Sequence, residues 1–228
     1  MVTAPDPHFT ADPLDGKRRE VLQNLLMDAA FDGWTADTLE RAVADTAKGT
    51  SAAILFPQGV RDALDFWAGE EDRVMAEAYE ALDVRPEKIR DKVTWLVRRR
   101  IEQMTPHREA ARRGAATLVL PVHAGLGPRL AWRTAGAIWQ ALGDSSTDGN
   151  WYTKRASLSA VYLSTLARWF ADDGNGQDDP YAATWDFLDD RIGNVMQFEK
   201  LKADMKKLPF DPASVAGFLG RLRYAAQK

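Results

Sequence analysis

The stretch "EVLQNLLMDAAFDGWTADTLERAVADTAKGTSAAILFP" (residues 20–57) decides how the chain folds near its N-terminus. Apolar residues recur at helical spacing until an Asp-Gly pair stops the first helix, and Thr35 can cap a second helix over residues 35–47. Gly49 then turns the chain into a short third helix, "SAAILF", which Pro57 closes. Two helices, a glycine turn and a short third helix are the outline of a helix-turn-helix unit.

The rest of the chain also predicts helices. No stretch alternates apolar and polar residues for long enough to indicate a strand, and "ATLVLPV" comes nearest. The further helices are expected over residues 58–82, 87–104, 105–121, 129–143, 150–170, 180–207 and 212–228. We therefore predict an all-α protein of about ten helices, with a small helix-turn-helix-like lobe (1–57), a larger helical body (58–208) and a final amphipathic helix (209–228).

Composition excludes several classes of protein. Of the 228 residues, 45% are hydrophobic and 28% are charged, which is typical of a globular chain and not of a disordered one. Because cysteine is absent, disulfides and thiolate sites are impossible. The N-terminus resembles neither a secretory signal nor a transit peptide, and no apolar run approaches the roughly 20 residues needed to cross a bilayer.

The sequence shows no catalytic pattern. Three histidines lie far apart in the chain, and no Walker loop, dinucleotide fingerprint or nucleophile elbow is present. The acidic pairs between residues 172 and 179 flank a Gly-containing stretch and are interpreted as a solvated loop, because they lack EF-hand spacing. We therefore expect no enzyme activity, no cofactor and no metal site.

A lobe of this kind followed by a larger helical body resembles the tetracycline-repressor type of regulator. Residues 1–56, however, carry five cations and nine acids, a net charge of −4, whereas DNA binding depends on cations near phosphates. The helix in the recognition position, "SAAILF", has no side chain that reads a base edge. We therefore expect no nucleic-acid binding, although a ligand-responsive transcriptional regulator stays an alternative.

Six motifs carry a more specific resemblance. They are "FDGWT" (31–35), "LFPQG" (55–59), "TPHREA" (105–110), "LAWRTAGAIW" (130–139), "GDSSTDGNWYTKR" (143–155) and "RIGNVMQFEK" (191–200). In this order they resemble the lipid-binding accessory protein family of ubiquinone (coenzyme Q) biosynthesis. The chain departs from that family at Gly149, where an aromatic residue is common, which could reshape the local surface.

The resemblance implies several functional properties. It implies a tetracycline-repressor-like fold without DNA binding, a buried apolar cavity for an isoprenoid quinone precursor or a phospholipid, and a homodimer. It also implies presentation of the precursor to the demethoxyubiquinone hydroxylase. Without a transit peptide the chain is interpreted as a bacterial member, located in the cytoplasm and peripherally associated with the inner face of the cell membrane. A lipid-free assembly scaffold is a second alternative.

A polar turn followed by Trp151 and Tyr152 marks the candidate partner site. Neighbouring helical residues point about 100° apart, so these two rings cannot both face one core. Either the rings seal the helix against Trp139, or they form an interface, where aromatic residues and arginine dominate the binding energy. The resemblance assigns hydroxylase binding to this surface, which comprises Asp148, Asn150, Trp151, Tyr152, Lys154 and Arg155.

Apolar residues of the central helices are candidates for the lipid cavity, although plain core is the alternative for each of them. They are Leu64, Trp67, Met75, Val93, Leu96, Leu118, Trp132, Ile138, Leu158 and Tyr162.

The last segment, "DPASVAGFLGRLRYAAQK", predicts a basic amphipathic helix. Residues 200–228 carry seven cations and two acids, a net charge of +5, which suits anionic headgroups. Docking of this helix on its own domain or on a second copy is the alternative. The residues expected to bind the membrane are Val215, Phe218, Leu219, Arg221, Leu222 and Arg223.

Overall fold

The computed structural model describes residues 12–144, 149–176 and 178–207, and in these ranges every regular element is a helix. The prediction of an all-α protein is therefore confirmed for the described residues. The α-helices are α1 (Asp15–Asp32), α2 (Ala36–Thr46), α3 (Ala52–Leu55), α4 (Val60–Glu80), α5 (Ile89–Glu102), α6 (Arg108–Leu118), α7 (Leu126–Ala141), α8 (Gly149–Ala171) and α9 (Ala182–Lys207). Two short 3₁₀ helices, Thr105–His107 and Pro121–His123, flank α6.

The first three helices begin and end where the sequence predicts. Helix α1 ends at Gly33, whose φ of 80° suits glycine and few other residues. The Thr35 hydroxyl accepts a hydrogen bond of 3.1 Å from the backbone N–H of Thr38 and so caps α2. These local signals are strong enough to fix the helix boundaries independently of packing.

One predicted helix is divided in two. The sequence predicts a continuous helix over residues 105–121, but the chain forms the 3₁₀ turn Thr105–His107 before α6 begins at Arg108. Pro106 lies in the first turn, where its missing N–H costs no hydrogen bond, and His107 then leaves the helical region with ψ of 28°. A proline that starts a helix can therefore leave a break directly after it.

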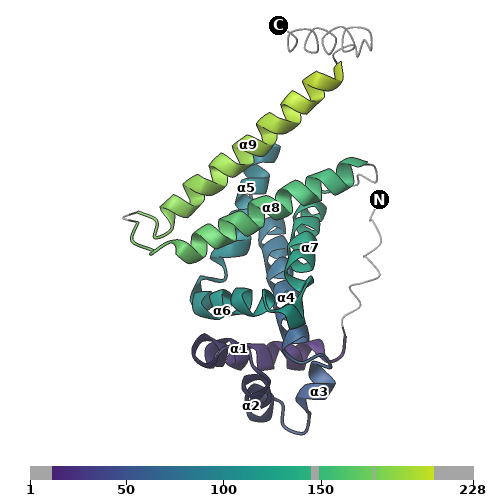
Figure 1. Ribbon diagram of the computed structural model, residues 1–228, viewed down its shortest axis with the longest axis vertical. Helices are drawn as coiled ribbons and strands as arrows, with labels where there is room; N and C mark the ends of the chain where they lie inside the picture. Colours follow the sequence, from purple (N-terminus) through teal and green to yellow (C-terminus); the bar gives the residue numbers. More distant parts are fainter. Residues whose placement is uncertain (1–11, 145–148, 177, 208–228) are drawn as a thin grey trace, which may run out of the picture. The chain divides into compact units, whose positions relative to one another are not determined.

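The chain divides into two compact units, Met1–Asp189 and Asp190–Lys228, and the boundary lies within α9. In the first unit α4 packs against α7 and α5, α7 packs against α8, and α1 packs against α2 and α6 (Figure 1). The predicted lobe boundary at residue 57 lies inside this unit, because α1 packs on α6 of the larger body. The cavity and the helix start described below both belong to the first unit.

Candidate functional site

An apolar cavity of about 360 Å³ lies among helices α4, α5, α6, α7 and α8. Small and apolar side chains form most of its wall, among them Leu64, Met104, Ala131, Leu130 and Leu166. A space of this size is at the lower end of the range for small-molecule pockets. The cavity is thus the strongest candidate for a binding site in the described residues.

Helix α6 closes one side of the cavity and can do so because its residues are small. Ala111, Gly114 and Ala115 line the space. A Cβ atom at Gly114 would lie 3.1 Å from Leu64 Cδ2 and 3.2 Å from Trp34 Nε1, so glycine permits a close approach that alanine would crowd. The wall therefore depends on the absence of a side chain at this position.

Trp34, in the turn between α1 and α2, connects the N-terminal helices to the cavity wall through a hydrogen bond and a ring contact. Its indole Nε1 donates a 2.9 Å hydrogen bond to the Ala110 carbonyl of α6. Its ring is stacked on that of Trp67, with centroids 5.4 Å apart and planes 20° apart. Because Trp67 lines the cavity, the helix-turn-helix-like part of the chain supports the wall from behind.

The polar part of the wall consists of Glu71, Arg100, Thr134 and Tyr162, and Arg100 is paired with the buried Asp72 outside the lining. Arg100 Nε donates to Asp72 Oδ1 at 2.7 Å, and the two residues are only 2% and 6% exposed. The Thr134 hydroxyl donates to the same oxygen at 2.8 Å, and Arg100 Nη2 donates to the Ala68 carbonyl at 3.2 Å. The Arg100 guanidinium also lies over the ring of Tyr162, 5.7 Å from its centroid. The charge on Arg100 is therefore compensated within the protein.

The titration of this cluster favours binding over catalysis. Burial alone would lower the pKa of the Arg100 guanidinium, but Tyr162, Asp72 and Glu71 nearby raise it above its ordinary value. Burial raises the pKa of the Tyr162 hydroxyl. Arg100 is thus charged and Tyr162 neutral at physiological pH, and neither of them is poised as an acid or base. A wall with a balanced pair suits an uncharged, largely apolar ligand.

The described part of the chain contains no group of three or more His, Asp or Glu side chains that could hold a metal ion.

The residues predicted to bind lipid fall into three groups. Leu64, Trp67, Leu118 and Tyr162 line the cavity. Trp132 is half-buried and lies beside Trp151, with ring centroids 5.8 Å apart. The remaining five are buried in the core and are not part of the cavity wall, namely Met75, Val93, Leu96, Ile138 and Leu158. Lipid binding by the first group stays a prediction.

The start of α8 holds a cluster of three aromatic rings. Trp151 and Tyr152 meet edge to face with centroids 4.7 Å apart, and both lie near Trp132 of α7. Tyr152 is 64% exposed, whereas Trp151 is half-buried. The rings therefore pack against Trp132 and not against Trp139, and one of them is presented to solvent.

Two cations follow the aromatic pair. The Arg155 guanidinium lies 3.9 Å from the Trp151 ring centroid, and burial lowers its pKa. Lys154 Nζ forms a 3.0 Å ion pair with Asp144 and lies 5.3 Å from the Trp139 ring centroid. Of the other predicted partner residues, Asp148 lies outside the described residues, and Asn150 is described only as part of the α8 backbone.

The residues predicted to bind the membrane, from Val215 to Arg223, also lie outside the described residues. Among the helices that the structure describes, none is long and apolar enough to cross a membrane.

Sequence reasoning missed two buried acids. The interpretation of residues 172–179 as a solvated loop is wrong for Asp172, which is 7% exposed. Its carboxylate accepts hydrogen bonds from the Thr184 hydroxyl at 2.7 Å and the Gly174 N–H at 3.2 Å. The Asp72–Arg100 pair was not predicted, because its two residues lie 28 positions apart and no local pattern connects them. The burial of Arg100 could have been predicted from its position in the helix, because Arg100 continues the apolar row of Val93, Leu96 and Val97 along α5.

Comparison with known proteins gives a consistent set of relatives. A family model described as COQ9 matches residues 124–199. The mitochondrial ubiquinone biosynthesis protein COQ9 of Homo sapiens is 26% identical over 218 residues, which cover 90% of this chain and 67% of the relative. The Rattus norvegicus protein of the same name is 27% identical over 234 residues, with 95% and 72% covered. The Drosophila melanogaster protein is 24% identical over 203 residues, with 87% and 61% covered.

This chain thus spans about two thirds of the length of the relatives that it matches. The matches confirm the family resemblance that the sequence motifs predicted: over most of its length, this chain is similar to the COQ9 proteins of ubiquinone biosynthesis.

Proposed function

We propose that this chain acts in ubiquinone biosynthesis by binding an isoprenoid lipid, a quinone precursor, in the cavity among α4 to α8, without catalysing a reaction itself. The observation that carries the proposal is the apolar cavity whose two charged lining residues are both bonded within the protein. Arg100 is paired with Asp72, and the Glu71 carboxylate accepts hydrogen bonds from Trp67 and Gln103. Exposing an isoprenoid tail to water costs about 0.8 kcal/mol for each CH₂ group. A carrier therefore removes a solvation barrier and leaves the chemistry to another protein.

The chemistry of the wall and the names of the relatives both support this function. Tyr162 and Arg100 are held in fixed charge states, which suits a binding site better than an acid–base site. The matched relatives are named as ubiquinone biosynthesis proteins. A quinone precursor combines a long apolar tail with an uncharged head, which corresponds to what this wall can accommodate.

We further propose that the start of α8 docks the demethoxyubiquinone hydroxylase. Tyr152 presents an exposed aromatic ring that is braced by Trp151 and Trp132, so little side-chain entropy is lost when a partner covers it. Aromatic residues near arginine are the usual anchors of protein interfaces. On this proposal the chain works as a homodimer at the inner face of the cell membrane, and its last segment supplies the membrane contact.

Native mass spectrometry with lipid extraction tests the cavity. Protein purified from cells should carry an isoprenoid lipid, and Ala115→Trp should remove most of it because Ala115 lines the cavity. Ala116→Trp is the matched control, since Ala116 is the next residue of α6 and is exposed. Thermal unfolding establishes that both variants fold. If the wild-type protein carries no lipid and takes none up, the lipid-free scaffold becomes the better explanation.

A pull-down with the hydroxylase tests the docking surface. Trp151→Lys should weaken binding by about 30-fold or more, the equivalent of the 2 kcal/mol expected for an interface hot spot. Phe31→Lys is the control, because Phe31 is an aromatic residue of α1 that is 81% exposed. Equal binding by the two variants would show that the hydroxylase does not dock at the start of α8.

A further inference from the structure

The loop between α6 and α7 exposes a continuous run of apolar side chains. Val119 is 81% exposed, Leu120 50% and Val122 76%, and the intervening Pro121 is exposed as well. Isolated exposed apolar residues are ordinary on protein surfaces, whereas a contiguous group marks a surface that contacts something apolar. The loop therefore needs an explanation beyond chance exposure.

The same loop borders the opening of the cavity. Val119 lines the cavity and is also largely exposed, which places an opening beside it. Pro128 at the start of α7 and Leu163 of α8 likewise line the cavity and are exposed, so the rim of the opening is apolar. An apolar ligand that enters here passes directly over the exposed loop.

The backbone of the loop is suited to an environment with little water. The N–H of Leu120 donates to Thr117 O at 3.1 Å, that of His123 to Leu120 O at 2.9 Å, and that of Ala124 to Pro121 O at 3.1 Å. Pro121 has no N–H group to pair. An unpaired N–H is costly where water is scarce, and this loop pairs three of its donors internally.

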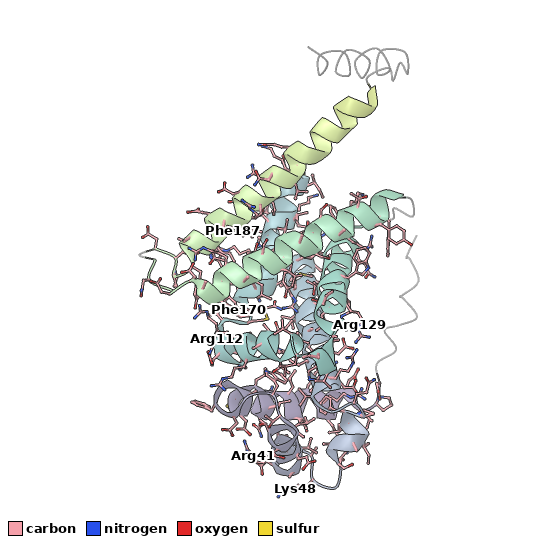
Figure 2. All side chains as sticks on the ribbon, viewed as in Figure 1. Arg41, Lys48, Arg112, Arg129, Phe170 and Phe187 are labelled. Carbon is pink, nitrogen blue, oxygen red and sulfur yellow. The ribbon has the colours of Figure 1, made fainter. Side chains whose placement is uncertain are left out.

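The charge around the loop identifies the apolar partner as an anionic lipid surface. Residues 109–143 contain four arginines and one acidic residue, Glu109, which pairs with Arg112 and Arg113. Arg129 and Arg133 share the carboxylate of Asp65, at 2.8 Å and 2.5 Å. Arg133 also lies 3.6 Å from Asp72, which is paired with Arg100, so three arginines meet two carboxylates and the cluster retains a net positive charge. The Arg129 side chain is 59% exposed and lies on the outside of the bundle (Figure 2). Cations beside exposed apolar residues favour anionic headgroups.

We propose that the loop of residues 119–123 rests on an anionic bilayer and is the entrance through which the cavity takes up its ligand. This inference rests on the proposed lipid-binding function. It adds a membrane contact separate from that predicted for the last segment, and it places the entrance directly on the bilayer. The ligand then moves from one apolar phase to another without crossing bulk water.

A single environment-sensitive label tests the contact. Because the chain contains no cysteine, Val122→Cys introduces a unique labelling site outside the cavity wall. Val84→Cys is the matched control, a valine 85% exposed in the loop between α4 and α5. With phosphatidylcholine vesicles containing phosphatidylglycerol, the label at 122 should shift to the blue and brighten several-fold, and the label at 84 should not. The response should be weaker with phosphatidylcholine alone.

Three results would overturn the contact. The first is the absence of binding, seen either as protein that does not float with the vesicles or as floating protein whose label at 122 keeps its fluorescence unchanged. The second is a label at 122 that is already blue-shifted without vesicles, which would mean that another part of the chain or a second copy covers the loop. The third is a response that appears only when a partner protein is added, which would make the loop a protein interface.

Ligand transfer separates failure of the entrance from failure of the proposed function. Uptake of a short-chain ubiquinone is followed by quenching of tryptophan fluorescence. Val122→Asp should slow uptake from anionic vesicles several-fold and leave binding from detergent micelles unchanged, whereas Val84→Asp should change neither. Equal uptake from vesicles by both variants would overturn the entrance. Wild-type protein that binds ubiquinone from neither source would contradict the proposed function, while the label at 122 would still decide the membrane contact.

Discussion

Two buried arginines of this chain are stabilised in opposite ways. Arg100, in the wall of the cavity, bonds to the Asp72 carboxylate, and its pKa is raised. Arg155, at the start of α8, is 8% exposed and stacks on Trp151, and its pKa is lowered because burial outweighs its surroundings. Among the described residues no carboxylate lies within ion-pair distance of Arg155. Within the described residues, Arg100 bonds directly to a carboxylate, whereas Asp144 acts on Arg155 only through its longer-range charge.

The difference separates a site that holds a neutral molecule from a surface that is suited to a charged one. A compensated pair costs little to keep beside an apolar ligand, because neither group seeks a partner in the ligand. A buried arginine that bonds to no carboxylate among the described residues is stabilised when an acidic group of a partner approaches it. The cavity wall and the start of α8 are thus suited to different partners, a lipid and a protein.

Removing Arg100 should have the largest effect. Arg100→Met removes the cation that bonds directly to the buried Asp72 carboxylate and leaves it only Arg133 Nε at 3.6 Å, which should lower the free energy of unfolding by about 3 kcal/mol. Urea denaturation measures this. Removing both charges, in Asp72→Asn with Arg100→Met, should recover a large part of the loss. A loss in the double variant that equals the sum of the single losses would show that the two charges do not act as a pair.

Asp172 extends the comparison of the two arginines to a buried acid, whose carboxylate accepts hydrogen bonds from uncharged donors. Burial alone would raise the pKa of its carboxyl, but hydrogen bonds from Thr184 and Gly174 lower it below its ordinary value. A lowered pKa means that this carboxylate stabilises the fold above its ordinary pKa of about 4, and that the contribution disappears as the pH falls through the folded value.

Asp172→Asn should therefore lower the free energy of unfolding at pH 7 by about 1–2 kcal/mol, because the amide offers one acceptor oxygen in place of two. The deficit relative to the wild-type protein should shrink as the pH falls below about 4. Urea denaturation across this pH range provides the measurement. A deficit that is independent of pH would show that packing, and not the charge, explains the effect.

Arg155→Met should have the smallest effect on the fold. Met keeps an apolar stem against Trp151 and removes a charge that burial disfavours, so the free energy of unfolding should change by no more than about 1 kcal/mol. Hydroxylase binding should still weaken if the Arg155 charge pairs with an acidic group of the partner. A loss of stability comparable to that of Arg100→Met would show that Arg155 contributes to the fold as much as Arg100 does.

Local chemistry allowed much of the fold to be predicted. The stop at Gly33 and the cap at Thr35 both follow from residues within a turn or two of one another. The break after Pro106 was not predictable in this way, because a proline in the first turn is compatible with either a continuous or an interrupted helix.

The cavity itself could not be predicted, because core and cavity walls use the same side chains. Leu64 and Leu96 are both buried leucines on central helices, and only Leu64 borders the empty space. The difference arises from the distances between helices, which depend on residues such as Gly114 that carry no apolar surface. The position of Arg100 in the row of Leu96 and Val97 distinguishes it from Arg98 and Arg99, but that row does not reveal that Asp72 lies opposite it.

The stacked indoles of Trp34 and Trp67 have an optical consequence. Two parallel rings at 5.4 Å couple their electronic transitions, and one of these rings forms part of the cavity wall. A ligand that displaces Trp67 by even a small rotation should change the near-ultraviolet circular dichroism of the pair. The chain thus contains its own spectroscopic reporter of occupancy, and the free and loaded proteins can be distinguished without a label.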